Sequence, residues 1–348
     1  MKKIDGEPPG DPKNQQIEIP LLKYIPATRE NRYFYENGLS KIIPKLTVKV
    51  HSNLDECYYL WQKFSPNQSI FDLWDFRYAW YLGYGYKLYF YTIYEKKQPL
   101  AVLPLWFDEE RKRYEWYGSY YMEDNKFFVK DENLIDLLFK IAPKPLSLDA
   151  IEIDEKYKSK NFFTKLILDE PKYIKDLKKY QSMDDLLSSL NKKNRHHLKS
   201  DYYKVLSLNP KIISGDADNE NSCQELIRLN MLRFDNKSDD FSDFHKEKRK
   251  KTFINIVKNS GVYRVKFNKV YIQNYLAAID LILTYKDTYC APRGGNDVYR
   301  FKGIGNFMVY FDFEDAIKNQ YKFFDCLQID YNWKHRFFEE KNLYRLVA

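Results

Sequence analysis

The feature that most constrains the fold is a succession of helices followed by strands that occurs twice along the chain. In the first half, a strand-like run at 46–50 comes before two helix-like segments, at 54–64 and 70–80. Three strand-like runs, at 87–94, 100–107 and 114–117, follow these helices. In the second half, the helix-like segments 222–234 and 244–259 precede strand-like runs at 261–268, 276–283 and 287–291. An offset of 176 residues places Leu100 on Leu276 and Gly118 on Gly294. This pattern predicts one α/β unit used twice, with its two sheets buried side by side or across a shared cleft.

Length and composition agree with a globular chain of two domains. The chain has 348 residues, which favours about two hydrophobic cores rather than one. Hydrophobic residues make up 44% and aromatic residues 18%, which is too apolar for a disordered chain. The most apolar stretch, Tyr78 to Tyr94, is interrupted by Lys87 and is better explained by strands than by a membrane span. Residues 1–16 carry no apolar core of a secretory signal.

Charge and cysteine usage limit the partners. Lys and Arg exceed Asp and Glu by 57 − 49 = 8, which attracts an anionic small ligand but does not by itself indicate nucleic acid, so no DNA partner is expected. The cysteines at 57, 223, 290 and 326 show no CxxC spacing, which argues against disulfides and structural zinc and fits a reducing, cytoplasmic location. The adjacent pair His196-His197 points in two directions on a helix, so no metal site is expected.

The expected organisation has three parts. Residues 1–44 form a tail and lead-in, of which 1–17 read as flexible; residues 45–175 form an N-terminal domain and residues 176–348 a C-terminal domain. Between the domains, Ser182 is a good helix N-cap, and the segment after it predicts a basic helix of about 20 residues that includes 192–199. Its charges form either a solvated face or a wall for a phosphate-bearing ligand.

The strongest local motif is Arg300-Phe-Lys-Gly-Ile-Gly-Asn306, which follows a strand and precedes an amphipathic helix at 306–318 and a strand at 322–327. Two glycines allow backbone N–H groups to turn toward a phosphate, and the helix N-terminus adds partial positive charge. Arg300 and Lys302 add countercharge. The motif lacks the GK[ST] of a Walker A loop and the glycine spacing of a Rossmann fingerprint. The alternative is a plain glycine turn that ends a strand.

A strand meander followed by [Q/R]xxGxG, a helix and a strand resembles the GNAT superfamily of acyl-CoA-dependent N-acyltransferases. Three further segments are similar to the CelD-type, FemAB-related branch with tandem GNAT domains: Leu190 to Arg195, Gly294 to Asp297 and Asp330 to Phe337. The resemblance spans about residues 45 to 340. It implies an α/β (α+β) fold of two tandem GNAT-like domains, each a mixed, largely antiparallel sheet flanked by helices.

The resemblance also implies one site for acetyl-CoA or another acyl-CoA, in the C-terminal half. The first half has no matching glycine motif in 119–124, so it is expected to form the substrate side. In this superfamily the loop amides hold the coenzyme pyrophosphate and a splayed strand end polarises the thioester carbonyl. The implied cofactor-binding residues are Arg293, Gly294, Gly295, Arg300, Lys302, Gly303, Ile304, Gly305 and Asn306.

Acyl transfer to an amine needs a base, donors for the oxyanion, and an acid or none for the thiolate. Asp297 is the candidate base, or else a turn-capping residue. Asp280, in mid-strand, is the second candidate base, or else faces solvent. Tyr331 is the candidate acid, or else a packing tyrosine. Covalent catalysis by Cys290 or Cys326 is not expected, because no histidine accompanies them.

Three residues are candidates for substrate binding. Lys334 matches a lysine common at this place in the branch and could bind substrate, or else it is a solvated surface lysine. Trp74 and Trp116 could stack on a sugar or acyl group, although most aromatic residues of the first half must belong to the core.

The expected function is N-acylation, above all N-acetylation, of a small primary amine. An amino sugar, a nucleotide sugar or another cell-envelope or polysaccharide precursor is the expected acceptor class. One alternative is a FemAB-like transferase that uses aminoacyl-tRNA. Such proteins usually carry a long helical hairpin, which this sequence lacks, but the basic segment 192–199 keeps the alternative open. The other is a binding protein that keeps the double fold without catalysis.

Overall fold

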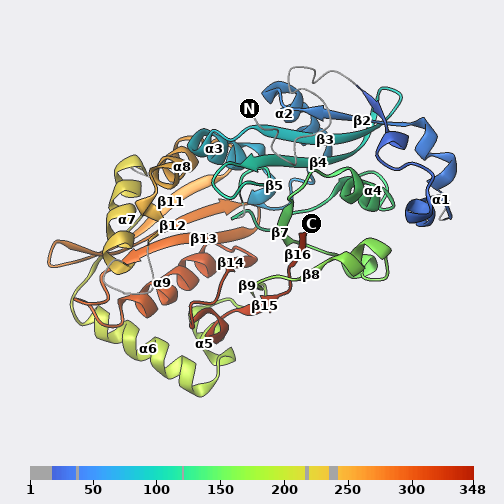
Figure 1. Cartoon of the computed structure of the whole chain (residues 1–348). Coiled ribbons are helices and arrows are strands. Elements are labelled where there is room, and N and C mark those ends of the chain that lie inside the picture. Colours follow the sequence, from blue (N-terminus) through green and yellow to red (C-terminus); the bar gives the residue numbers. More distant parts are fainter. Residues whose placement is uncertain (1–17, 37–38, 120, 216–218, 235–241) are drawn as a thin grey trace. The chain divides into compact units, whose positions relative to one another are not determined.

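The structure is a computed structural model of the chain, and it describes residues 18–36, 39–119, 121–215, 219–234 and 242–348 (Figure 1). The chain divides into two compact units. The first comprises Met1–Arg77, Gly85–Asp169 and Leu343–Ala348, and the second comprises Tyr78–Tyr84 and Glu170–Asn342. The long stretch of the first unit ends at residue 169, whereas the boundary was expected at 175. Residues 343–348 belong again to the first unit. The expected flexible tail at 1–17 lies outside the described residues.

The first unit contains a six-stranded antiparallel sheet and a three-stranded one. The larger sheet has the order β1-β2-β3-β4-β5, with β6 paired to β4, and its strands are β1 (Ile19–Pro20), β2 (Leu46–His51), β3 (Leu88–Glu95), β4 (Gln98–Asp108), β5 (Arg113–Trp116) and β6 (Phe128–Val129). The smaller sheet has the order β7-β16-β8, with β7 (Ser147–Ile151), β16 (Tyr344–Val347) and β8 (Ile167–Leu168). Strand β16 therefore closes a sheet whose other strands come from the first half of the chain.

The helices of the first unit are α1 (Arg32–Glu36), α2 (Leu54–Phe64), the start of α3 (Trp74–Tyr84) and α4 (Leu134–Ile141). Helix α2 begins where predicted, because the Asn53 side chain accepts hydrogen bonds from the amides of Asp55 and Glu56. The predicted helix at 70–80 instead begins as a 3-10 turn, Ile70–Asp72, that a capping box with Ser69 stabilises, and α3 follows it.

The lead-in before residue 45 belongs to the core of this unit. Leu21, Ile25 and Ile43 are fully buried there against the larger sheet. Its prolines break the chain into short turns, which is why the sequence shows no periodicity over a segment that still packs. Short 3-10 helices in this unit are Leu21–Lys23, Arg29–Asn31, Leu39–Lys41, Ile43–Lys45, Glu155–Tyr157 and Asn161–Lys165.

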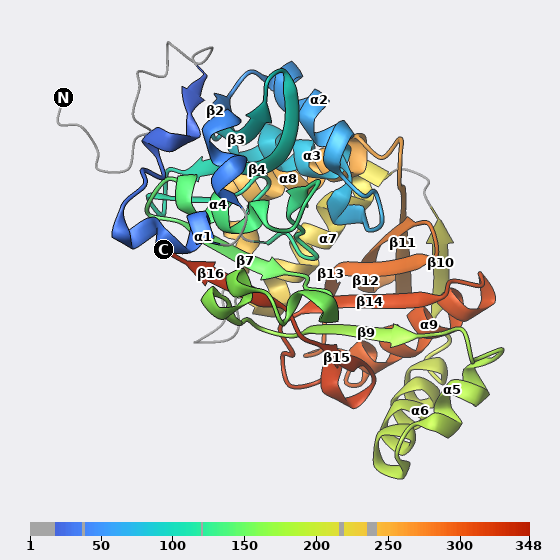
Figure 2. The same ribbon diagram turned by 90° about the vertical axis from the view of Figure 1, so that its right-hand side faces the viewer.

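The second unit is built on one seven-stranded sheet with the order β10-β11-β12-β13-β14-β9-β15 (Figure 2). Its strands are β9 (Lys172–Asp176), β10 (Lys211–Gly215), β11 (Arg264–Ile272), β12 (Tyr275–Tyr285), β13 (Thr288–Asn296), β14 (Phe323–Gln328) and β15 (Glu339–Lys341). Every pairing is antiparallel except that of β13 with β14, which is parallel. The predicted meander and the crossover to a final strand are confirmed.

Helices cover both faces of this sheet. They are α5 (Met183–Ser189), α6 (Lys192–Leu206), α7 (Asn219–Phe234), α8 (Glu247–Lys258) and α9 (Ile304–Lys318), with 3-10 turns at Asp243–His245 and Lys334–Arg336. Neighbouring residues of a strand face opposite sides of a sheet. A Cβ on Gly295 would meet α7, whereas a Cβ on Gly294 would meet the side chain of Asp280. Asp280 in turn contacts Asp312 of α9. Helices α7 and α9 therefore lie on opposite faces of the sheet, as Figure 1 shows.

The predicted basic helix of about 20 residues is wrong, because the structure has two helices there. The chain is extended at Leu190, and the Asn191 side chain accepts a hydrogen bond from the Asn194 amide to start α6. An asparagine followed by helix formers provides a second N-cap within the segment, and a cap favours a new start over continuation. Leu198 and Val205 are buried toward α9, and the His196 and His197 side chains are exposed. Among the described residues, no helix is long and apolar enough to cross a membrane.

Candidate active site

The strands β13 and β14 separate in the middle of the second sheet. They pair only at Thr288 with Phe323, Tyr289 with Phe324, and Cys290 with Asp325, while β13 continues to Asn296. Beyond Cys290 the two strands and α9 enclose a cavity of about 270 Å³. Its lining comes from the sheet, α7, α9 and the segment after β14: Arg233, Asp280, Ala291, Arg293, Gly294, Asn296, Gly305, Asn306, Met308, Val309, Asp312, Phe324, Cys326, Trp333 and Phe338.

The N-terminus of α9 opens on this cavity. Gly303 is the N-cap residue, with φ of +92°, and no side chain caps the helix. A Cβ on Gly303 would lie 2.9 Å from Asp201 Oδ1, so both the backbone angle and the packing require glycine. A Cβ on Gly305 would find no heavy atom nearer than 3.9 Å. Gly305 therefore leaves open space where the amides of the first helical turn lack intrahelical partners, which suits a phosphate group.

The two glycines of β13 have different neighbours. Gly294 lies opposite Asp280 of β12 in the antiparallel ladder. At Gly295, a Cβ would lie 2.7 Å from the Asn230 backbone nitrogen, so glycine lets α7 pack directly on the strand. The Asn230 Nδ2 also donates to the Gly294 carbonyl at 2.7 Å. These contacts fix the strand end at the edge of the cavity.

Two carboxyl groups meet inside the cavity. Asp280 projects from β12 and Asp312 from α9, and the two side chains are hydrogen-bonded to each other. Burial raises the pKa of Asp280 to about 6, against the opposing effects of the Asp312 hydrogen bond and of Arg233. Burial and the neighbouring Asp280 charge raise the pKa of Asp312 well above its usual range. At neutral pH the pair therefore shares one proton and carries one negative charge.

The first candidate base from the sequence, Asp297, is placed as a turn residue. Its Oδ1 accepts a hydrogen bond from the Arg300 amide at 2.9 Å, and its Oδ2 accepts one from the Tyr275 hydroxyl at 3.0 Å. Both oxygens thus hold the loop that leads into α9. The structure brings Asp280, and not Asp297, to the cavity.

Lys334 is buried, with 5% of its surface exposed, and so is neither a surface lysine nor accessible to a substrate. Its Nζ donates to the carbonyls of Cys326, Leu327 and Gln328 at 2.5, 3.3 and 2.6 Å. An ammonium group has three N–H donors, so these three acceptors satisfy it. The candidate acid Tyr331 has 48% of its surface exposed, and its ring lies 5.7 Å from Lys334 Nζ.

The two candidate stacking tryptophans belong to the core of the first unit. Trp74 packs against the rings of Tyr58, Trp61 and Tyr117, and Trp116 donates from Nε1 to the Asp149 carbonyl at 3.0 Å. Both are at least 93% buried, so neither presents a free face to a ligand.

The cationic residues of the motif lie at the loop. Lys302 and Arg300 are exposed, and the Arg300 guanidinium lies 4.5 Å from the centre of the Tyr275 ring. Arg293 lines the cavity and pairs with Asp243 at 2.8 Å. Ile304 is buried in the core below the loop, whereas the Asn306 side chain donates to Asp201 Oδ2 at 2.6 Å and ties α9 to α6.

Sequence reasoning missed Asp312 and Arg233. Asp312 does carry a signal, because it interrupts a stripe of apolar residues spaced by four along α9: Ile304, Met308 and Ala316. A carboxylate on the buried face of an amphipathic helix needs a partner and therefore marks a site. Arg233 lies near the end of α7 and shows no such pattern.

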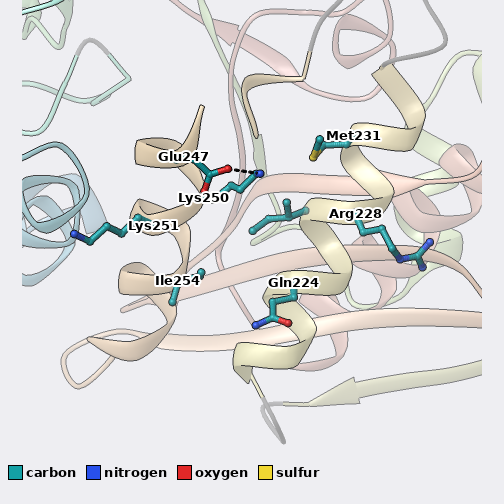
Figure 3. Close-up of a pocket in the computed structure, with 8 residues that line it drawn as sticks. Gln224, Arg228, Met231, Glu247, Lys250, Lys251 and Ile254 are labelled. Atoms are coloured by element: carbon teal, nitrogen blue, oxygen red, sulfur yellow. Dashed lines mark hydrogen bonds and ion pairs between the residues drawn. The ribbon is translucent and has the colours of Figure 1, made fainter. Parts of the chain in front are cut away.

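A second cavity, of about 430 Å³, lies between α7 and α8 (Figure 3). Three of its eight lining residues are apolar, namely Ile227, Met231 and Ile254, and Glu247 pairs with Lys250 at 2.6 Å along α8. Among the described residues that line it, Glu247 is the single carboxylate. This cavity therefore offers a weaker basis for proton transfer than the one at Asp280.

Other groups play no evident part in the chemistry. All four cysteines are buried, and burial raises the pKa of Cys326 to about 12, so its thiol stays protonated. Across the described part of the chain, no group of three or more His, Cys, Asp or Glu side chains is placed to hold a metal ion.

No protein-family model matches the sequence, and no curated protein does. Solved structures do match the fold. One is FemX, at 12% identity and a TM-score of 0.54, with 86% of this chain and 96% of that chain covered. Another is a tandem GNAT protein from the clavulanic acid biosynthesis pathway, at 9% identity and a TM-score of 0.51, with 87% and 98% covered. The chain thus has the tandem GNAT, FemAB-related fold that the sequence predicted.

Proposed function

We propose that this protein is an acyltransferase that transfers an acyl group from an acyl-CoA thioester to a primary amine. The observation that carries the proposal is the meeting, in one cavity, of the uncapped N-terminus of α9, the separated strands β13 and β14, and the carboxylate of Asp280. Phosphate binding, access to a strand edge and proton transfer are the three requirements of such a reaction.

The residues present fit a coenzyme. The amides at Gly305 and Asn306 and the side chains of Arg300 and Lys302 would hold its pyrophosphate, and the space at Gly305 is kept free of a side chain. The β13 edge beyond Cys290 would hold the remainder of the coenzyme and donate to the oxygen on which negative charge develops. The coenzyme itself supplies the activated acyl group.

Asp280 is the proposed base. A primary amine arrives as an ammonium ion, and the Asp280 carboxylate attracts it and removes one proton, which frees the lone pair for attack. A pKa of about 6 leaves Asp280 ionised at neutral pH, yet more basic than an exposed aspartate. Tyr331 stays a prediction as the acid, and comparison of native protein with Tyr331→Phe tests it.

Within this function, we favour an acetyl donor and an amino sugar or related envelope precursor as acceptor. The support for the donor is the resemblance of the glycine motif to that of acyl-CoA-dependent N-acyltransferases, together with the similarity of the fold to a tandem GNAT protein. The support for the acceptor is the resemblance of the sequence motifs to the CelD-type, FemAB-related branch. A FemAB-like transfer from aminoacyl-tRNA is the second candidate, because the fold is also similar to that of FemX.

Calorimetric titration with coenzyme A and acetyl-CoA tests the proposal. We expect saturable binding by the native chain, at least ~10-fold weaker binding by Gly305→Glu, and unchanged binding by Gly261→Glu. Gly261 is the matched control, because a Cβ there also meets nothing within 4 Å, but it lies outside the cavity lining. Acyl transfer to a panel of amino sugars then identifies the acceptor. A native chain that binds neither ligand would overturn the acyl-CoA donor and direct the search to aminoacyl-tRNA.

A further inference from the structure

Asp312 is a buried acid on α9 with defined partners on two sides. Only 3% of its surface is exposed. On one side, its Oδ1 accepts a hydrogen bond from Asn268 Nδ2 at 2.7 Å, and the Tyr289 hydroxyl oxygen lies 3.4 Å from the same oxygen. On the other side, it contacts the carboxyl group of Asp280. An oxygen that accepts this hydrogen bond does not carry the carboxyl proton, so a proton on Asp312 belongs on the oxygen that faces Asp280.

The two polar groups that lie against Asp312 are themselves held by neighbours. Asn268 Nδ2 also contacts the Tyr289 hydroxyl at 2.8 Å, and that hydroxyl donates to Asp315 Oδ2 at 2.9 Å. Asp315 in turn pairs with Lys266. The network therefore fixes the side chain of Asp312 from β11, β13 and α9 at once. Polar networks in the interior are stable only when their members are satisfied in this way.

Charged and titratable groups face the pair from every packed element. Arg233 comes from α7, Arg293 from β13, Lys266 from β11 and Asp315 from α9, and Cys326 of β14 is a neutral thiol. Two carboxylates in contact in a low-dielectric site cannot both be ionised without a large penalty. Arg293 pairs with Asp243 and Lys266 pairs with Asp315. Asp280 lines the cavity and is less buried than Asp312, so the negative charge of the pair is better placed on Asp280.

We propose that Asp312 is a positioning residue that keeps its own proton at neutral pH and donates a hydrogen bond to Asp280, so that Asp280 faces the cavity as a single, oriented base. This inference rests on the proposed function for its catalytic consequence, but the protonation of Asp312 itself does not. When an N–H bond of the ammonium ion breaks, its proton binds to Asp280, the electron pair stays on nitrogen, and Asp312 keeps its proton throughout. Asp280 then releases the acquired proton to water.

Infrared difference spectroscopy tests the protonation without any activity. At about pH 7.5, above the pKa of about 6 for Asp280, we expect the native chain to show a protonated-carboxyl band that Asp312→Asn lacks and Asp280→Asn keeps. A band missing from the native chain, or one lost in Asp280→Asn rather than Asp312→Asn, would overturn the inference. Failure of acyl transfer with the band in place would instead overturn the proposed function.

The pH dependence of kcat/KM tests the positioning role. Asp312→Asn keeps an N–H donor toward Asp280, so its acidic limb should stay near that of the native chain. Asp312→Leu removes the donor that stabilises the Asp280 anion, so its acidic limb should move to higher pH by about one unit, with coenzyme affinity unchanged. A purely structural role would lower activity in both variants without moving either limb, and that result would contradict the inference.

Discussion

Gly294 lies opposite Asp280 on neighbouring strands, and a Cβ at position 294 would come within 2.1 Å of Asp280 Oδ1. The absence of a side chain at this position therefore creates the space that the carboxyl group occupies. The sequence analysis assigned Gly294 to the coenzyme through its backbone, and the structure adds a second reason for glycine. The Asp280 side chain can reach the cavity only over a residue without a Cβ.

The first prediction concerns this contact. We expect Gly294→Ala to displace the Asp280 carboxyl group and to lower kcat/KM by ~10²-fold, because catalysis is sensitive to displacements of about 1 Å. Coenzyme affinity should change little. Gly261→Ala is the control, since its Cβ would meet nothing within 4 Å. Steady-state kinetics beside calorimetric binding would measure both effects, and equal losses in the two variants would count against this role of Gly294.

The second prediction concerns stability and pH. The pKa of Asp280 is raised on folding, from 3.8 to about 6, so the folded chain binds this proton more tightly than the unfolded chain. This contribution is fully present below about pH 3.8 and is lost as the pH rises through about 6. We therefore expect Asp280→Asn to gain stability relative to the native chain across this window, by up to about 3 kcal/mol. Urea unfolding of both proteins at several pH values measures the difference, and a gap that stays constant with pH would refute it.

The third prediction concerns the buried ammonium group of Lys334. Replacement by methionine keeps the volume but leaves the carbonyls of 326–328 without their donor. We expect Lys334→Met to lower the free energy of unfolding by about 2–3 kcal/mol. The exposed Lys192 provides the control, and Lys192→Met should change stability by less than about 0.5 kcal/mol. Similar values for the two variants would show that the carbonyl contacts contribute little.

The fourth prediction separates the two glycines of the α9 loop. Gly303→Ala should lower stability by about 1–2 kcal/mol, because its φ of +92° disfavours a side chain and Asp201 lies against it. Gly305→Val should cost much less stability from contacts, since its Cβ points into open space, but should weaken coenzyme binding by at least ~10-fold. Thermal unfolding with and without coenzyme A compares the two, and a reversed pattern would contradict the assigned roles.

The sequence predicted local structure well where short-range patterns decide it. Helix 54–64, the meander of the second half and the loop before α9 appear where their periodicity and glycines place them. Asp297 shows the limit of this reasoning. Its closeness to the glycine loop suggested a base, but an aspartate three residues before an available amide forms a turn hydrogen bond instead.

The candidate site depended on contacts that the sequence does not display. Asp280 and Asp312 are 32 residues apart and meet only because β12 and α9 pack on each other. Lys334 follows a segment with several residues at positive φ, including Leu327 and Ile329. This segment turns the chain back, so that the Lys334 side chain reaches the end of strand β14. Neither arrangement follows from residue spacing, because both depend on the tertiary path of the chain.

The position of β16 has a consequence for how the chain acquires its structure during synthesis. Strand β16, from residues 344–347, lies between β7 and β8 and supplies the ladder of both. A ribosome therefore completes the whole of the second unit before it releases the strand that joins β7 to β8. The six-stranded sheet of the first unit needs no residue beyond 129, whereas the three-stranded sheet is complete only once residues 344–347 have been made.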